Sequence, residues 1–326
     1  MSKKKSLVEL RDSAKSNSNS NAREQHAQTH TRAIWLALFV TFLWSTSWVL
    51  IKIGLGQIPP LLFAGLRYGL AFVIMLPWLL RPASRRELAG LQRNDLVALA
   101  LLGLVIIAIT QGAQFIALAH IPAHTLSLLL SLSTLSIAFL GVMFLGESLR
   151  GRQWMGVAVT LIGALIYFGR LGTVSTFGLA VGVLNLLATS IGAIQGRALN
   201  RQAKLSALTV TGVSIGVGSA ALLVLGLLTE PWPTLSGREW LIILWLAAVN
   251  TAFAFTLWNH SLRTLTAAES GVINNTMLIQ IAILAWVFLG ERISPLQGLG
   301  LLLAAAGTVL VQWKPRTRQA AKTQPN

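Results

Sequence analysis

The chain has 326 residues, of which 54% are apolar and only 11% are Asp, Glu, Lys or Arg. An average soluble domain carries roughly 25% charged residues, so this composition excludes an ordinary soluble protein and predicts a polytopic membrane protein. The net charge of +16 does not indicate nucleic-acid binding, because the basic residues gather in the two tails and in short connections between apolar segments.

Ten apolar segments follow one another along the chain, and each has about the 20 residues that a helix needs to cross a bilayer. Short connections rich in proline and glycine separate them. The predicted spans are residues 33–53, 61–80, 96–117, 123–145, 151–169, 177–197, 206–228, 240–261, 267–289 and 295–313. We expect residues 1–32 to be a disordered basic tail and residues 314–326 to be a second basic tail.

The distribution of Lys and Arg predicts the orientation in the membrane. Of the 26 basic residues, 21 fall in segments on the side of the N-terminus, one lies within a span, and four lie on the other side: Lys52, Arg170, Arg238 and Arg292. Cytoplasmic segments of membrane proteins carry the excess of Lys and Arg, so both termini are expected to face the cytoplasm.

A repeat divides the chain into two similar halves. The sequence Phe-Leu-Gly-Glu at residues 144–147 recurs 144 positions later at residues 288–291. Further matches at the same offset are Ala123 with Ala267, Gln153 with Gln297, Gly156 with Gly300 and Gly163 with Gly307. Because each copy holds five spans, the second copy enters the membrane with opposite polarity. The sequence therefore predicts an all-α fold of ten transmembrane helices, arranged as two inverted five-helix repeats (residues 33–169 and 177–313) around a central cavity.

Three groups of residues resemble the EamA-type branch of the drug/metabolite transporter superfamily. They are residues 42–55 (FLWSTSWVLIKIGL), the two FLGE blocks with their following Gln and Gly, and residues 257–273 (LWNHSLRTLTAAESGVI). The resemblance covers roughly residues 33–313. It implies ten helices around a central cavity, a place in the bacterial inner membrane, and export of amino acids or related metabolites, with aromatic amino acid exporters as functional analogues.

Polar and indole side chains inside apolar segments are candidates for the cavity, because lipid does not solvate bare amides. The candidates are Trp44, Ser45, Trp48, Gln111, Gln114, Asn185, Thr189, Asn250, Trp258, Asn259, Asn274, Asn275 and Gln280. Arg67, Glu147 and Glu291 are candidates for the rim of the cavity or for its gates.

Each of these residue types also has a plainer role. Serines such as Ser131 and Ser133 often bond their own helix, and Trp44 and Trp48 can equally belong to an interfacial belt. The favoured interpretation of Arg67 is that it extends to the outer interface. The favoured interpretation of Glu147 and Glu291 is that each caps the next helix or forms an ion pair with a nearby arginine.

The sequence thus favours a secondary transporter that exports small amphipathic metabolites, foremost amino acids. Export of lipophilic cations or of nucleotide sugars is an alternative, as is an intramembrane enzyme or a scaffold. No cofactor or metal site is expected, because cysteine is absent and the histidines are scattered; ATP-driven transport is not expected either, since no phosphate-binding loop occurs. No carboxylate lies near the middle of a span, which predicts weak coupling to protons. Substrate identity and oligomeric state remain open.

Overall fold

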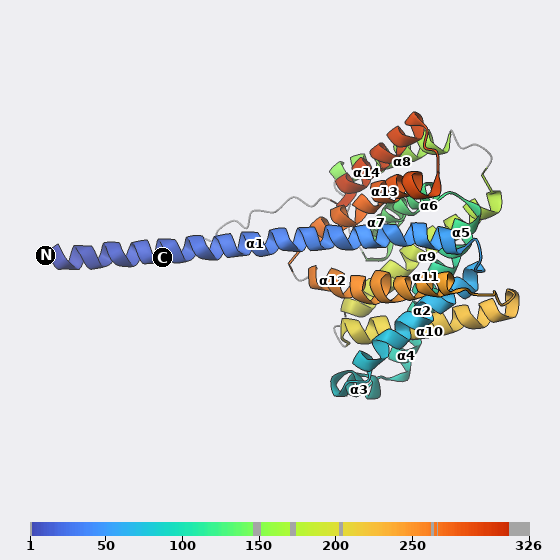
Figure 1. Cartoon of the computed structure of the whole chain (residues 1–326). Coiled ribbons are helices and arrows are strands. Elements are labelled where there is room, and N and C mark those ends of the chain that lie inside the picture. Colours follow the sequence, from blue (N-terminus) through green and yellow to red (C-terminus); the bar gives the residue numbers. More distant parts are fainter. Residues whose placement is uncertain are drawn as a thin grey trace.

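The structure is a computed structural model that describes residues 2–145, 151–169, 174–201, 205–261, 264–265 and 267–312. Every regular element in this part of the chain is helical (Figure 1). In chain order they are α1 (Ser2–Gly54), α2 (Pro60–Leu79), α3 (Pro82–Ala89), α4 (Arg93–Gly103), the π-helix η1 (Leu104–Ile109), α5 (Thr110–His120), α6 (Ala123–Ser131), α7 (Ser133–Leu145), α8 (Gly151–Phe168), α9 (Thr176–Arg201), α10 (Ala207–Thr229), α11 (Gly237–Ala247), the π-helix η2 (Ala248–Phe253), α12 (Ala254–Ser261), α13 (Ala267–Leu289) and α14 (Pro295–Gln312).

The first helix is longer than predicted. We expected residues 1–32 to be disordered, but α1 begins at Ser2 and extends far beyond the rest of the bundle (Figure 1). Residues 2–33 contain neither proline nor glycine. Once a helix is formed, each further residue adds a hydrogen bond at little cost, so nothing in this segment ends the helix that the first apolar segment begins.

Eight helical segments among the described residues are long and apolar enough to cross a membrane. A ninth, within α14, is apolar but shorter (Pro295–Val311). Large apolar side chains cover the outside of the bundle: Leu165 is 73% exposed and Leu228 is 78% exposed. A soluble protein rarely exposes so much contiguous apolar surface, whereas lipid accommodates it.

Helices α8 and α14 pack so closely that their backbones touch. A Cβ atom on Gly156 would lie 2.7 Å from the carbonyl oxygen of Gly307, and one on Gly163 would lie 2.6 Å from that of Gly300. The lower-numbered glycine of α8 thus meets the higher-numbered glycine of α14, so the two helices run antiparallel. Small residues allow this close approach, which is a common way for helices to associate in lipid.

Helices α2 and α10 also pack against each other, and each is capped by a carboxylate that follows the other. Glu230, after α10, accepts hydrogen bonds from the backbone N–H groups of Leu61 (3.0 Å) and Leu62 (2.8 Å) at the start of α2. Glu87, in α3 directly after α2, accepts hydrogen bonds from the backbone N–H of Ser206 (3.2 Å) and the hydroxyl of Thr209 (2.5 Å) at the start of α10. Negative charge at a helix N-terminus is favourable, so both caps stabilise the pair.

The two π-helices lie at equivalent places in the repeat. The bounds of η1 and η2 differ by 144 positions at both ends. A threonine hydroxyl in or directly after each π-helix donates to the carbonyl five residues earlier: Thr110, directly after η1, to Val105, and Thr251, within η2, to Leu246, both at 2.9 Å. π-Helical turns are rare and are found mostly at functional sites, so the third and eighth predicted spans share an unusual local geometry.

Candidate functional site

A cavity of about 140 Å³ lies between α1, the α6–α7 pair and α13. Residues from both halves of the chain therefore surround it. Its lining residues are Trp48, Ser127, Leu130, Ser131, Ser133, Thr134, Asn274, Asn275, Met277, Leu278 and Ile281. Three predicted cavity residues (Trp48, Asn274 and Asn275) lie together here. None of the described lining residues carries a charge, so the cavity suits a neutral or zwitterionic solute.

The fourth predicted span is interrupted beside this cavity. Helix α6 ends at Ser131 and α7 begins at Ser133, with Leu132 between them. The hydroxyls of Ser127 and Ser131 donate to the carbonyls of His124 (2.9 Å) and Leu128 (2.7 Å), three residues earlier. Such bonds bend helices. Ser131 therefore bonds its own helix, as the plainer interpretation held, and it also lines the cavity.

A chain of polar groups joins α1 to α13 next to the cavity. Ser45, which is fully buried, donates to the side-chain carbonyl of Gln280 at 2.9 Å. The amide nitrogen of Gln280 donates in turn to Thr276 (3.0 Å) and Thr41 (3.3 Å). Two further predicted residues, Ser45 and Gln280, are thus brought together, although they satisfy each other rather than face an open space.

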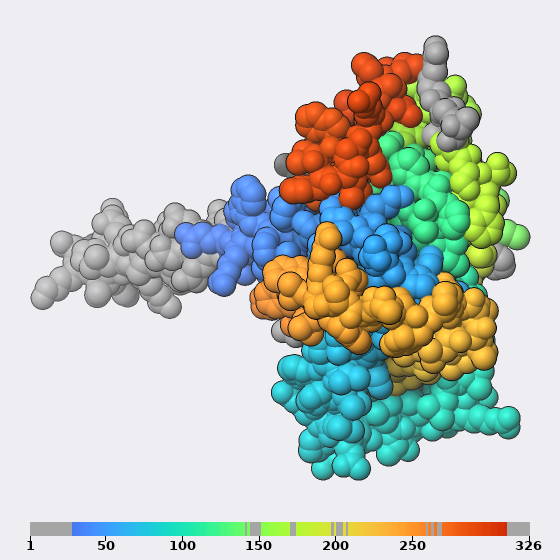
Figure 2. Space-filling model, turned by 45° about the vertical axis from the view of Figure 1, so that its right-hand side comes forward, coloured from blue at the N-terminus to red at the C-terminus, as the bar shows by residue number. Residues whose placement is uncertain are grey.

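The other side of α1 holds a separate cluster, because α1 lies between α13 and the α11–α12 segment (Figure 2). The indole nitrogen of Trp44 donates to the backbone carbonyl of Asn250 in η2 (3.1 Å), and its ring lies 5.2 Å from that of Trp258. The Asn250 amide donates to Thr46 (3.3 Å) and to the carbonyl of Leu43. Trp44 and Trp48 therefore do not face one cavity, although they are one turn apart.

The remaining amides lie apart from the cavity. Gln111 accepts a hydrogen bond from Tyr68 at 2.7 Å, and Gln114 is buried. Thr189 donates to Asn185 at 3.2 Å, and the Asn185 amide nitrogen is buried without a partner among the described residues. The side chain of Asn259 and the whole of Glu147 lie outside the described residues.

The expectation that Arg67 extends to the membrane surface is wrong. Its side chain is only 5% exposed, because α2 packs against α10, α11 and η2. The guanidinium group donates to Thr251 of η2 at 3.3 Å and lies 5.0 Å from the centre of the Tyr68 ring. A buried guanidinium is tolerated where hydrogen bonds and an aromatic face replace water, and these contacts tie α2 to η2.

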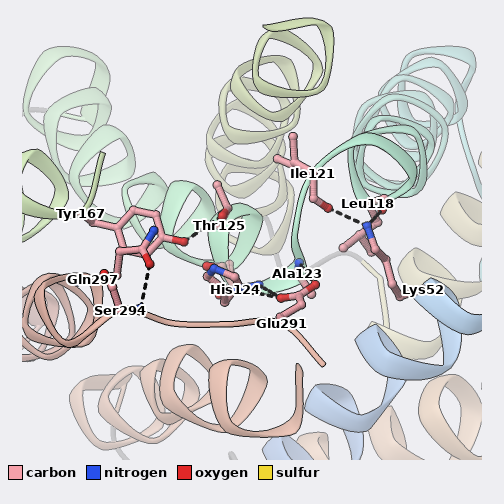
Figure 3. A network of polar contacts seen from close by, with 11 residues as sticks. Lys52, Leu118, Ile121, Ala123, His124, Thr125, Tyr167, Glu291, Ser294 and Gln297 are labelled. Atoms are coloured by element: carbon pink, nitrogen blue, oxygen red, sulfur yellow. Dashed lines mark hydrogen bonds and ion pairs between the residues drawn. The ribbon is translucent and has the colours of Figure 1, made fainter. Parts of the chain in front are cut away.

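A polar network lies at the end of the cavity where α5 stops and α6 begins, and Figure 3 shows how its side chains converge. We call this the Lys52 end. Lys52, in the last turn of α1, donates to the carbonyls of Ile121 (2.8 Å) and Leu118. Glu291 accepts from the backbone N–H groups of Ala123 (2.7 Å) and His124 (3.2 Å) and from the His124 ring.

Glu291 follows α13 and lies outside the membrane-spanning segment. Burial acts to raise the pKa of its carboxyl group, but hydrogen bonds from the His124 ring and from two backbone N–H groups outweigh burial and hold the pKa below its ordinary value. We expected Glu291 to cap the next helix or to pair with an arginine. Instead it caps α6, which lies far from it in sequence, and its side-chain partner is a histidine.

Sequence reasoning missed the residues that anchor this network and the caps. Lys52 appeared only as one of four basic residues on the outer side, and neither Glu87 nor Glu230 was a candidate. A signal was present, since Lys52 lies in the last turn of a span and Glu87 and Glu230 follow corresponding spans of the two repeats. Their partners, however, are backbone groups and, for Glu87, also the hydroxyls of Ser206 and Thr209, and a sequence pattern does not reveal these pairings.

The model of the EamA-like transporter family matches this sequence twice, over residues 31–169 and 176–313. The chain belongs to the EamA-like transporter family. The resemblance predicted from residues 42–55, the FLGE blocks and residues 257–273 is therefore confirmed, and the protein is a multi-pass membrane transporter rather than an enzyme.

Curated relatives of this EamA-like transporter match most of its length. An S-adenosylmethionine/S-adenosylhomocysteine transporter of Chlamydia trachomatis serovar L2 is 26% identical, covering 85% of this chain and 87% of its own. A probable amino-acid metabolite efflux pump of Escherichia coli K12 is 25% identical, covering 88% and 97%. One crystal structure shares the fold with a TM-score of 0.63 at 19% identity, covering 86% of this chain and 96% of its own.

Proposed function

We propose that this EamA-like transporter exports small metabolites, foremost amino acids, by alternating access of the cavity between α1, α6–α7 and α13. The observation that carries the proposal is the uncharged lining of that cavity, which combines amide and hydroxyl groups with apolar side chains. The amides of Asn274 and Asn275 can donate to a carboxylate and accept from an ammonium group. The Trp48 indole offers an apolar surface for the side chain of an amino acid.

The size of the cavity favours amino acids over larger cargo. Its volume of about 140 Å³ is well below the roughly 300–1,000 Å³ of common ligand pockets. An S-adenosylmethionine or a nucleotide sugar would require the helices to separate much further than a small amino acid would. A lipophilic cation would find no carboxylate among the described lining residues.

The proposal also covers the topology: the chain has ten spans in two inverted repeats and lies in the plasma membrane of a bacterial cell. Both termini face the cytoplasm. The antiparallel pairs α8–α14 and α2–α10 support it, because each joins corresponding elements of the two repeats. Related repeats of opposite polarity can pack in two similar ways, one open to each side of the membrane. The candidate gates are Arg67, Glu147 and Glu291.

Weak coupling to protons is part of the same proposal. The lining holds no titratable side chain among the described residues, and Glu291 lies at the end of the cavity with its carboxylate occupied by α6. Transport by facilitated diffusion or exchange therefore fits better than a proton pump.

Efflux from proteoliposomes tests the proposal. Vesicles with the purified full chain are loaded with radiolabelled phenylalanine, threonine, homoserine or S-adenosylmethionine, with and without a pH gradient. We expect faster efflux of at least one amino acid than from empty vesicles, and little change with the gradient. No efflux of any amino acid, or efflux of S-adenosylmethionine alone, would contradict the proposed substrate class.

A further inference from the structure

Two opposite charges hold the connection between α5 and α6. The ammonium group of Lys52 binds carbonyls at the C-terminal end of α5, and the carboxylate of Glu291 binds N–H groups at the N-terminal end of α6 (Figure 3). The last carbonyls of a helix carry partial negative charge and its first N–H groups carry partial positive charge. Each side chain therefore has the sign that its helix end attracts, and we call this arrangement the clamp.

The clamp joins three distant parts of the chain. Lys52 belongs to α1 and Glu291 to the α13–α14 connection. The third part is the connection between α5 and α6, which consists of Ile121 and Pro122. Trp48 of the cavity lies one turn before Lys52, and Ser127 lies one turn after Ala123, so the clamp is about 6 Å from the cavity along each helix. The α5–α6 connection therefore lies about one helical turn beyond the cavity at its Lys52 end, where the two charges hold it.

The second repeat lacks two of the three side chains of this clamp at the corresponding positions of the sequence. At the repeat offset of 144 positions, Gly196 corresponds to Lys52 and Ala268 corresponds to His124. A Cβ atom on Gly196 would meet nothing within 4 Å, so open space surrounds the position where a second lysine would begin. The second repeat therefore has neither a cation nor an imidazole at the positions that correspond to Lys52 and His124.

We propose that Lys52, His124 and Glu291 are gating residues that close the Lys52 end of the cavity in the resting state. The cavity of the empty transporter is then accessible from the end where Gly196 lies. This inference rests on the proposed alternating-access function. In the proposed orientation the Lys52 end is external, and the resting transporter loads its substrate from the cytoplasm. The unequal closures therefore set the side from which substrate first binds, whereas the substrate gradient sets the direction of net transport.

The absence of native cysteine makes a direct test possible. Ser133→Cys places a single thiol in the cavity of the full chain, and Thr234→Cys in a separate variant marks the Lys52 end, where Thr234 is exposed between α10 and α11. A membrane-impermeant maleimide is applied to intact cells and to inside-out vesicles. Whichever preparation labels Thr234→Cys presents the Lys52 end, so this assignment does not depend on the proposed orientation or on transport.

We expect the cavity thiol to react slowly from the Lys52 end and rapidly from the other. Lys52→Met and Glu291→Gln should each raise the rate from the Lys52 end roughly tenfold, because each leaves one helix end without its charge. Arg292→Gln is the matched control, since it removes an exposed cation next to Glu291 and should leave the rate unchanged. Gly196→Lys should slow labelling from the opposite end.

Equal rates from both ends in the unsubstituted background would overturn the inference, as would an unchanged rate from the Lys52 end in folded Lys52→Met and Glu291→Gln. If both of these variants fail to fold, as judged by size-exclusion chromatography, Gly196→Lys provides the test. An unchanged rate of labelling from the opposite end in that variant rejects the inference. A transporter that labels as expected but moves no amino acid would leave this inference standing and refute the proposed substrate class.

Discussion

Gly156 of α8 and Gly307 of α14 meet backbone to backbone, and exchanging the two repeats turns this contact into the one between Gly163 and Gly300. At the repeat offset, Gly156 corresponds to Gly300 and Gly163 to Gly307. Two contacts that exchange in this way are what a twofold axis between the repeats would produce, so they support the proposed inverted arrangement. The same reciprocity relates the caps that Glu87 and Glu230 place on α10 and α2.

Enlarging a glycine at the α8–α14 contact should destabilise the protein. In Gly163→Leu the new side chain would meet the backbone of α14, because even a Cβ atom would lie 2.5 Å from the nitrogen of Ala304. We expect a loss of at least about 1–3 kcal/mol in the free energy of unfolding, seen as a lower melting temperature in detergent. Gly298→Leu is the control, since a Cβ atom there meets nothing within 4 Å. Equal melting temperatures for the two variants would show that the helices do not pack as described.

Removing the carboxylate caps should weaken the α2–α10 pair. Glu230→Gln and Glu87→Gln each exchange a charged acceptor for a neutral amide at a helix N-terminus, which costs about 1 kcal/mol. The two caps lie at opposite ends of the pair, so the double variant should lose about the sum of the two single losses. Thermal unfolding of the three variants measures this. A melting temperature unchanged from that of the wild type in all three would argue against the caps.

The sequence was sufficient for the helical class and for the family, because apolar segment length and a repeated motif are properties of the chain itself. The two repeats could also be found, since FLGE and its flanking glycines recur at one offset. The π-helices could not be predicted. Residues 104–109 (LVIIAI) and 248–253 (AVNTAF) match only at Val105 with Val249 and Ala108 with Ala252, and the extra residue in each turn depends on packing against other helices.

The site was predicted less well than the fold. The expectation placed Asn185 and Asn250 in the cavity; both are buried, but neither is among the lining residues of the cavity described above. Trp44 and Trp48 share a helix face by spacing, yet α1 lies between two partners, so one indole meets η2 and α12 and the other meets the cavity. Arg67 was misjudged because its partner Thr251 is 184 positions away.

The two asparagines of the cavity should matter for transport more than for stability. Asn274→Ala and Asn275→Ala each remove hydrogen-bonding groups that the substrate is proposed to use, at a cost of about 1–3 kcal/mol. We expect KM for amino acid efflux to rise roughly tenfold in each, with little change in the melting temperature of Asn274→Ala. Gln57→Ala, an exposed amide in the α1–α2 connection, is the control. A KM equal to that of the wild type in both asparagine variants would place the substrate elsewhere.

The clamp should resist mild acid. Because the pKa of Glu291 is held below its ordinary value of 4.5, its contribution is fully present above pH 4.5 and is lost as the pH falls through the lowered pKa. The titratable or charged groups near this carboxylate are Lys52, His124, Tyr167 and Arg292. Labelling of Ser133→Cys from the Lys52 end should therefore stay slow between pH 7 and pH 5 and accelerate only in stronger acid. A large acceleration between pH 7 and pH 5 would contradict the clamp as described.

The polarity of the two halves is the most direct test of the account. Gly90, at the end of α3, and Thr234, before α11, are both exposed, and each can carry the only cysteine of the chain. An impermeant thiol reagent added to intact cells should label Thr234→Cys and spare Gly90→Cys, and inside-out vesicles should give the reverse. Labelling of both positions from the same side would contradict the inverted arrangement on which the cavity, its gates and the proposed export depend.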